Sequence, residues 1–113
     1  MKFPDPVERA AEMAKQLHNA TASLQFDDYL SNRLVQAASE MMLIHMGTAL
    51  GRMRHLGIRH SAQAQASTLF QLRTYLMHST RDVDNDRVWD AIHNTVPVVL
   101  AALPTSPIPS PTS

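Results

Sequence analysis

Arg73 and His78 are the two residues of this 113-residue chain whose types and spacing best suit chemistry on a phosphate. Four residues separate them, and both lie near the end of a segment in which apolar side chains recur at helical spacing. A guanidinium is permanently cationic and can stabilise a phosphate that gains negative charge. An imidazole moves protons near neutral pH. The pair therefore suggests acid–base chemistry on a phosphate ester.

The spacing of this pair does not by itself establish that chemistry. Residues five apart lie about 140° around a helix, so Arg73 and His78 do not point the same way. Thr74, His78 and Arg81, by contrast, share one face. On spacing alone, an arginine and a histidine at a helix end are more often a surface residue and a capping imidazole, and that alternative stays open here.

Other arrangements that support catalysis are missing from the sequence. His55 and His60 flank a loop, but no cluster supplies the further ligands that a metal site there would need. The chain has no cysteine, which excludes disulfides and thiolate ligands. It also has no glycine-rich phosphate loop, nucleophile elbow or paired carboxylates. We therefore expect neither a metal nor an organic cofactor.

Length and composition indicate one cytoplasmic domain. A chain of 113 residues has room for a single core. No run of about 18 apolar residues is present, the N-terminus lacks the layout of a signal peptide, and the absence of cysteine fits a reducing compartment. Ten Lys and Arg balance ten Asp and Glu, so the basic excess usual in a nucleic-acid binder is missing. Six of the eight arginines nevertheless lie between residues 52 and 87, where a local positive surface can form.

The elements that must position the pair are helices. Few glycines and many Ala, Leu, Met and Gln predict an all-α domain, an antiparallel bundle of four to five helices over residues 1–103. The predicted helices are Asp5–His18, Asp27–Arg54, Ala62–Ser79, and a last one that begins after the N-cap Asp84 and is kinked or divided at Pro97. Residues 104–113 form a Pro/Ser/Thr-rich tail that we expect to be disordered.

The long second helix is predicted to be central. Two apolar rows run along it and predict contacts on more than one side: Leu30, Leu34, Ala37, Met41 and Ile44, and Val35, Ala38, Met42, Ala49 and Met53. Gly47 and Gly51, four residues apart, would let another backbone come close, either within the protomer or at a subunit contact. Gly57 is suited to end this helix in the left-handed conformation.

Several segments, in order, resemble HepT-like proteins, which are small helical members of the HEPN superfamily. The likeness covers about residues 5–103. The segments that carry it are Thr-Ala-Ser-Leu-Gln-Phe-Asp-Asp-Tyr-Leu at 21–30, Arg-Leu-Val-Gln-Ala-Ala at 33–38, Ile-His-Met-Gly-Thr-Ala at 44–49, the Arg73 to His78 motif, and Val-Asp, Val-Trp and Val-Pro at 83–84, 88–89 and 96–97.

This resemblance implies a specific activity. HepT proteins are the toxin half of bacterial toxin–antitoxin pairs, and they are metal-independent ribonucleases that act as homodimers. By resemblance, Arg73 and His78 of two subunits meet in a cleft at the dimer interface. There the RNA 2′-hydroxyl attacks the adjacent phosphorus, His78 acts as general base or acid, and Arg73 stabilises the phosphate. The implied protein partner is a nucleotidyltransferase antitoxin of the MntA type.

Three threonines depart from the family pattern. Thr74 stands where the family has asparagine or another amide-like residue, and Thr48 replaces a glutamate that could orient the cleft. Thr80 occupies the position of the tyrosine to which the antitoxin adds AMP. These departures and the zero net charge give a second hypothesis, a catalytically inactive HEPN-type interaction module that binds a nucleotidyltransferase.

Overall fold

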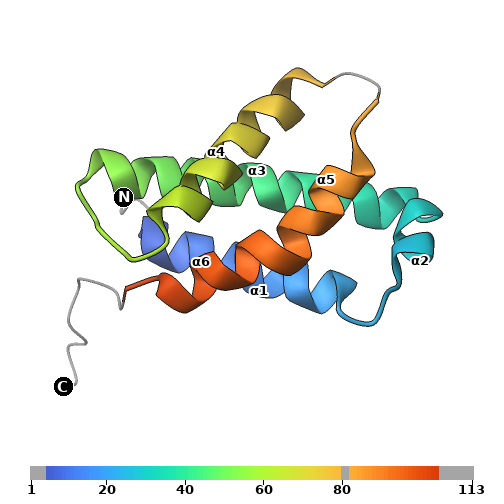
Figure 1. The fold of residues 1–113 in the computed structure, drawn as a ribbon, viewed down its shortest axis with the longest axis horizontal. Helices are drawn as coiled ribbons and strands as arrows, with labels where there is room; N and C mark the ends of the chain where they lie inside the picture. Colours follow the sequence, from blue (N-terminus) through green and yellow to red (C-terminus); the bar gives the residue numbers. More distant parts are fainter. Residues whose placement is uncertain (1–4, 80–81, 105–113) are drawn as a thin grey trace.

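Every regular element that the computed structural model describes, over residues 5–79 and 82–104, is helical. The elements are α1 (Pro6–Thr21), α2 (Phe26–Leu30), α3 (Arg33–His55), α4 (Gln63–His78), α5 (Asn85–Asp90), the π-helical turn η1 (Ala91–Thr95) and α6 (Val96–Ala102). The last three follow one another without a break, so the described part holds five helical segments (Figure 1). This confirms the predicted all-α class and bundle. Thr80 and residues 105–113 of the predicted tail lie outside the described residues.

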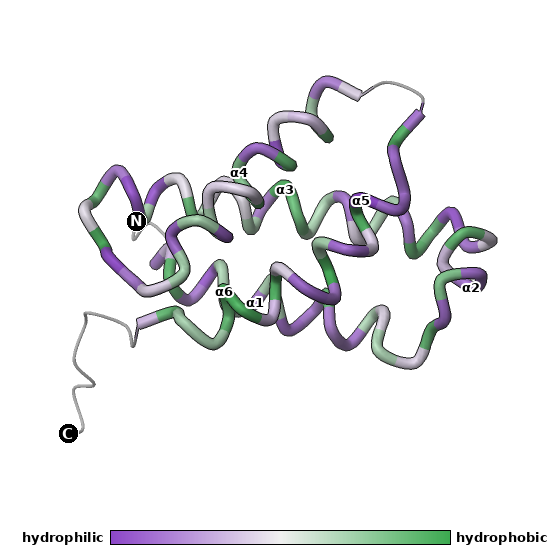
Figure 2. The backbone as a smooth tube through the Cα atoms, viewed as in Figure 1, coloured by the Kyte–Doolittle hydropathy of each residue, from purple (hydrophilic) through white to green (hydrophobic). Residues whose placement is uncertain are grey.

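The bundle is built around α3. Helices α1 and α4 pack along it, and the α5–η1–α6 segment closes the core against α1 and α4 (Figure 1). Along α1, α3 and α4, hydrophobic residues recur between hydrophilic ones, which is the pattern of amphipathic helices around a shared core (Figure 2). The largest fully buried apolar side chains are Tyr29, Leu17, Leu43, Met46, Met53, Leu69, Leu72, Val88 and Val99. No helix within the described ranges is both long and apolar enough to cross a membrane.

The prediction of one helix from Asp27 to Arg54 is wrong at its start. The chain forms the short α2, breaks at Ser31 and Asn32, and begins again as α3. Asn32 has extended backbone angles, and its side-chain oxygen accepts a hydrogen bond from the Val35 amide at 3.1 Å. Asparagine is among the preferred N-cap residues because it satisfies an amide that has no partner within the helix. Asn32 therefore starts a new helix where apolar periodicity alone predicts continuation.

Most of the first apolar row lies outside the protomer core, although Ile44 at its end packs against the core. Leu34 is 80% exposed, Met41 is 55% exposed and Leu30 is 45% exposed. The side chains that α3 buries are Ser39, Leu43, Met46, Gly47, Ala49, Leu50 and Met53. At about 100° per residue, the row through Leu34 and Met41 lies on the opposite side of the helix from these. Since α1 and α4 pack on the buried side, this row remains on the surface.

The two glycines of α3 make their close approach within the protomer. A Cβ at Gly47 would lie 2.7 Å from the Cβ of Arg73, and one at Gly51 would lie 2.7 Å from the ring of Phe70. Both neighbours belong to α4. The sequence left open whether the glycines allow a close contact within the protomer or at a subunit contact, and the structure shows a contact within the protomer. This packing fixes the position of Arg73 against α3.

Two predicted helix breakers act as expected. Gly57 has a φ of +76°, the left-handed conformation that terminates α3. At the other end of the chain, the Val96 amide donates to the carbonyl of Ala91, five residues back, and α6 then begins with Pro97 in its first turn. Because proline has no amide hydrogen to continue the helical ladder, the chain widens into the π-helical turn just before it.

Candidate active site on helix α4

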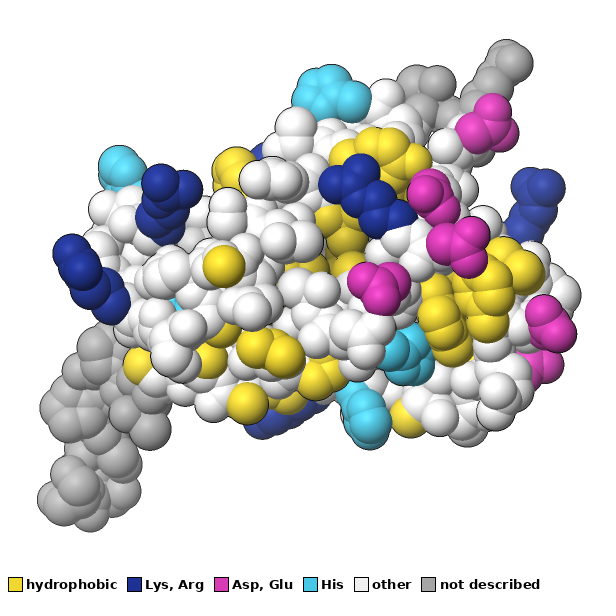
Figure 3. Space-filling view, viewed as in Figure 1, with side chains coloured by type: hydrophobic (Ala, Val, Ile, Leu, Met, Phe, Trp, Pro, Cys, Tyr) yellow, Lys and Arg dark blue, Asp and Glu magenta, His cyan; other side chains and the backbone are white. Residues whose placement is uncertain are grey.

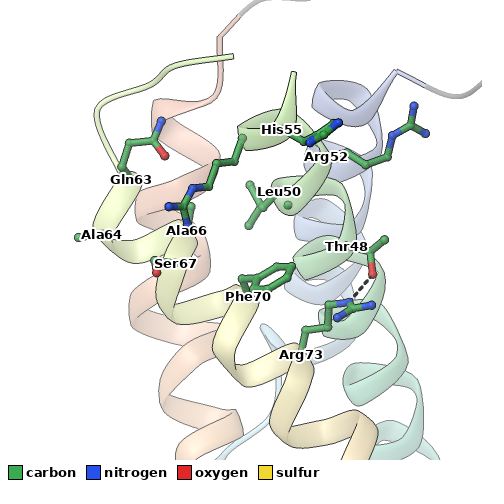
Figure 4. A pocket seen from close by; sticks show the side chains of 12 residues that line it. Thr48, Leu50, Arg52, His55, Gln63, Ala64, Ala66, Ser67, Phe70 and Arg73 are labelled. Atoms are coloured by element: carbon green, nitrogen blue, oxygen red, sulfur yellow. Dashed lines mark hydrogen bonds between the residues drawn. The ribbon is translucent and has the colours of Figure 1, made fainter. Parts of the chain in front are cut away.

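Arg73 is held against α3 by two contacts. Its Nε donates a hydrogen bond of 2.7 Å to the hydroxyl of Thr48, and its guanidinium carbon lies 5.4 Å from the centre of the Phe70 ring (Figure 4). Thr48 in turn donates to the Ile44 carbonyl at 3.0 Å, so its hydroxyl hydrogen is already used and its lone pair faces the arginine. Arg73 is half-buried. The guanidinium therefore has a defined direction.

The contact to Thr48 suits phosphate binding by Arg73. A guanidinium has five N–H donors, and the bond through Nε uses one of them. The other four lie on the two terminal nitrogens, which form the planar fork that matches two phosphate oxygens. Thr48 thus orients Arg73 without occupying the fork.

His78 is the last residue of α4 and is exposed. Its Nδ1 lies 2.7 Å from the carbonyl oxygen of Thr74, one helical turn earlier. A carbonyl oxygen can only accept, so Nδ1 is the donor and carries the hydrogen. In the neutral imidazole Nε2 then has the lone pair. This is the tautomer that a general base needs, with the accepting nitrogen directed away from the backbone.

Thr74 acts on the site through its backbone. Its carbonyl fixes His78, and its exposed hydroxyl donates to the Phe70 carbonyl at 3.3 Å within the same helix. Thr80, the fourth residue predicted for this site, lies outside the described residues.

Tyr75 lies inside the motif, and its contacts hold neighbouring parts of the chain together. Its hydroxyl accepts from the Asp84 amide at 2.9 Å and donates to the Asp82 carbonyl at 3.5 Å. The guanidinium carbon of Arg87 lies 4.6 Å from the centre of its ring. Tyr75 thereby ties the segment before α5 to the end of α4, close to His78.

One protomer does not bring Arg73 and His78 into the same cavity. The groove between α3 and α4 is lined by Arg73, Thr48 and Phe70, and His78 is not part of it. This agrees with the angle of about 140° between residues five apart on a helix. Within the described ranges no group of His, Cys, Asp or Glu is arranged to hold a metal ion. Within one protomer, Arg73 and His78 therefore do not line a common groove.

Thr48 and Gly47 are the two site residues whose contacts sequence reasoning missed. Thr48 and Arg73 are 25 residues apart, so their hydrogen bond depends on the register between α3 and α4. Two signals in the sequence come near it: the pair of glycines four residues apart predicts a close approach without identifying its partner, and the family resemblance marks position 48 as one that could orient the cleft.

These observations define a class of protein. It is an all-helical bundle in which one helix ends with an Arg, four further residues and a His. The family model for ribonuclease HepT-like proteins matches residues 10–105. The chain belongs to this family, which confirms the resemblance seen in its motifs. No curated protein and no solved structure matches the chain.

Proposed function

We propose that the protein is the ribonuclease toxin of a bacterial toxin–antitoxin pair and that it cleaves RNA without a metal ion, using Arg73 and His78. Membership in the ribonuclease HepT-like family supports the activity. The observation that carries the proposal is the state of the two side chains. Arg73 is oriented by Thr48 with its terminal nitrogens left for a phosphate, and His78 has Nδ1 bound to a carbonyl, which leaves Nε2 to accept a proton.

In the proposed reaction the RNA 2′-oxygen attacks the adjacent phosphorus while Nε2 of one His78 takes the hydroxyl proton. The bond from phosphorus to the 5′-oxygen breaks, and this oxygen receives a proton from the imidazolium of the second copy's His78. Arg73 stabilises the negative charge that grows on the non-bridging oxygens. The products are a 2′,3′-cyclic phosphate and a 5′-hydroxyl.

This reaction needs a homodimer, and the surface of the protomer supports one. Leu34 and Met41 on α3 and Met77 on α4 are large apolar side chains that are each more than half exposed. Leu34 and Met41, seven residues apart, lie on one face of α3, and an exposed apolar row of this kind supports an interaction surface. The row on α3 continues at helical spacing to Thr48, the partner of Arg73. A second copy packed on this row places two copies of the motif near each other.

The activity is tested by measuring cleavage of single-stranded RNA with a chelator present. His78→Ala is expected to lower the rate by about 10²- to 10⁴-fold, the usual contribution of a general acid–base group. Arg73→Ala is expected to lower it by about 10²-fold or more through lost charge stabilisation. Equal rates for the wild type and both variants would reject these two assignments.

The proposed antitoxin is a nucleotidyltransferase that modifies the position of Thr80. Co-expression of the two proteins followed by intact-mass measurement tests this, and a gain of one or more AMP masses at Thr80 supports it. The second candidate, an inactive interaction module, is favoured by the threonine at position 80 and by the zero net charge. It predicts a stable complex with no added mass and no RNA cleavage by the wild type.

A further inference from the structure

A groove between α3 and α4 begins at Arg73 and runs away from His78 toward the loop that joins the two helices (Figure 4). Its volume is about 670 Å³, which is within the range of small-ligand sites. Nothing in the proposed cleavage reaction uses this space. Because Arg73 stands at one end of it, anything bound there is a direct neighbour of the phosphate that Arg73 holds.

The middle of the groove is an aromatic platform. Phe70 is 41% exposed, although it is a large apolar side chain next to the core. Its ring packs against Gly51, where an added Cβ would lie 2.7 Å from Cε1 of the ring, so the missing side chain of Gly51 makes room for it. An exposed ring in a groove can stack with any nucleic-acid base, since every base has a π-face.

The two ends of the groove are cationic. Arg54 and His55, from the last turn of α3, line the end opposite Arg73. No carboxylate lines the groove in the part of the chain that the structure describes. Residues 41–81 contain five arginines and no Asp or Glu. On the face shown in Figure 3 the acidic side chains lie over α2 and α5, away from the end where α3 turns into α4. A neutral chain thus has a locally positive groove.

We propose that this groove binds one nucleotide of a single-stranded RNA, next to the nucleotide that is cleaved. The base stacks on Phe70, and the phosphate beyond it lies against Arg54 and His55. The inference rests on the proposed ribonuclease function and adds the path that the substrate follows on each protomer. Stacking and phosphate contacts carry little sequence information, so the groove binds any of the four bases.

Binding of a non-cleavable RNA tests the groove independently of catalysis. The probe is a fluorescein-labelled eight-nucleotide 2′-O-methyl RNA of mixed sequence, titrated with the full chain and followed by fluorescence anisotropy. Phe70→Ala is expected to weaken binding about tenfold, the size of one lost base–aromatic stack. Arg54→Gln is expected to weaken it and to reduce the slope of log K against log salt by about one.

Matched controls separate the groove from general effects. Arg33→Gln removes the same charge at the other end of α3, and Val98→Ala removes an exposed apolar side chain on α6. Both should bind the probe as the wild type does. A probe with one abasic position provides a second readout. Loss of the stacked base should weaken binding by the wild type but not by Phe70→Ala.

The outcomes distinguish this inference from the proposed function. Since the probe cannot be cleaved, an inactive protein still reports on the groove. Cleavage that depends on His78 together with unchanged probe binding in Phe70→Ala and Arg54→Gln overturns the inference alone. If these substitutions instead shift the monomer–dimer equilibrium and leave probe affinity unchanged, a second copy occupies the groove and the inference is wrong. Should Phe70→Ala fail to fold, the exposed Arg54→Gln decides.

Discussion

The two glycines of α3 give a sharp prediction because the same substitution meets different obstacles at each. At Gly47 an added Cβ would lie 2.7 Å from the Cβ of Arg73 and 3.1 Å from the carbonyl oxygen of Leu69. Carbon atoms prefer about 3.5 Å or more, so the helices must separate by roughly 0.8 Å at this point. A Cβ cannot rotate away from its own backbone. Gly47→Ala therefore moves α4 itself.

At Gly51 the obstacle is a side chain that can turn. An added Cβ would lie 2.7 Å from Cε1 and 3.1 Å from Cδ1 of Phe70, and rotation of the ring relieves both contacts. Each alanine adds about 1 kcal/mol of helix propensity relative to glycine. Overpacking against a backbone costs about 1–3 kcal/mol. We expect Gly47→Ala to lower the free energy of unfolding by about 1 kcal/mol and Gly51→Ala to leave it unchanged or raise it by up to about 1 kcal/mol.

Urea denaturation followed by circular dichroism, at one fixed protein concentration, measures both free energies. The critical result is which variant has the lower free energy of unfolding, since each serves as the control for the other. Gly47→Ala should also cleave RNA more slowly, because the displaced Arg73 loses its 2.7 Å bond to Thr48. A Gly47→Ala protein as stable as Gly51→Ala would refute the close packing of α4 on α3 at Arg73.

Three further predictions follow from single contacts. Thr48→Val keeps the shape of the side chain but removes the hydrogen-bond acceptor for Arg73. The rate of RNA cleavage should therefore fall about fivefold, equivalent to about 1 kcal/mol, while the protein still folds. Cleavage at the wild-type rate would show that Thr48 does not orient Arg73. Leu34→Glu places a charge on the proposed dimer surface at a side chain that is 80% exposed, so the protomer should still fold but should not dimerise. Light scattering should show a monomer, and a dimer that persists would mean that the interface does not include Leu34. Burial lowers the pKa of His93, and the nearby His18 lowers it further. The unfolded state then binds more protons, so the midpoint of thermal unfolding should fall as the pH drops below about 6.5, and His93→Gln should weaken that dependence.

Local signals were sufficient to predict most of the helices. Asp84 forms the N-cap of α5 and Gly57 ends α3, as their residue types predict, and Pro97 disturbs the last helix by widening it into the π-helical turn η1 without breaking it. Each of these effects depends on a residue and its immediate neighbours in the chain. The break at Asn32 was not predicted, because the apolar row continues across this N-cap residue and periodicity alone indicates one uninterrupted helix.

The contacts of the site were harder to predict, since they depend on how helices are placed against each other. The row through Leu34 and Met41 has the spacing of a core row, yet both side chains are more than half exposed, because periodicity alone does not tell which face of a helix its neighbours cover. The hydrogen bond from Arg73 to Thr48 needs the register between α3 and α4. The motif of Arg73 and His78 was visible in the sequence, and the family resemblance marked position 48 as one that could orient the cleft, but the hydrogen bond between Arg73 and Thr48 was not predicted.

The chemical ends of the cleaved RNA test the central claim most directly. Single-stranded RNA is incubated with the full chain and a chelator, and the fragments are analysed by mass spectrometry. Attack by the 2′-hydroxyl with Arg73 and His78 predicts fragments that end in a 2′,3′-cyclic phosphate, formed about 10²-fold or more slowly by His78→Ala. Fragments that end in a 3′-hydroxyl, or the same cyclic products formed by His78→Ala at the wild-type rate, would contradict it.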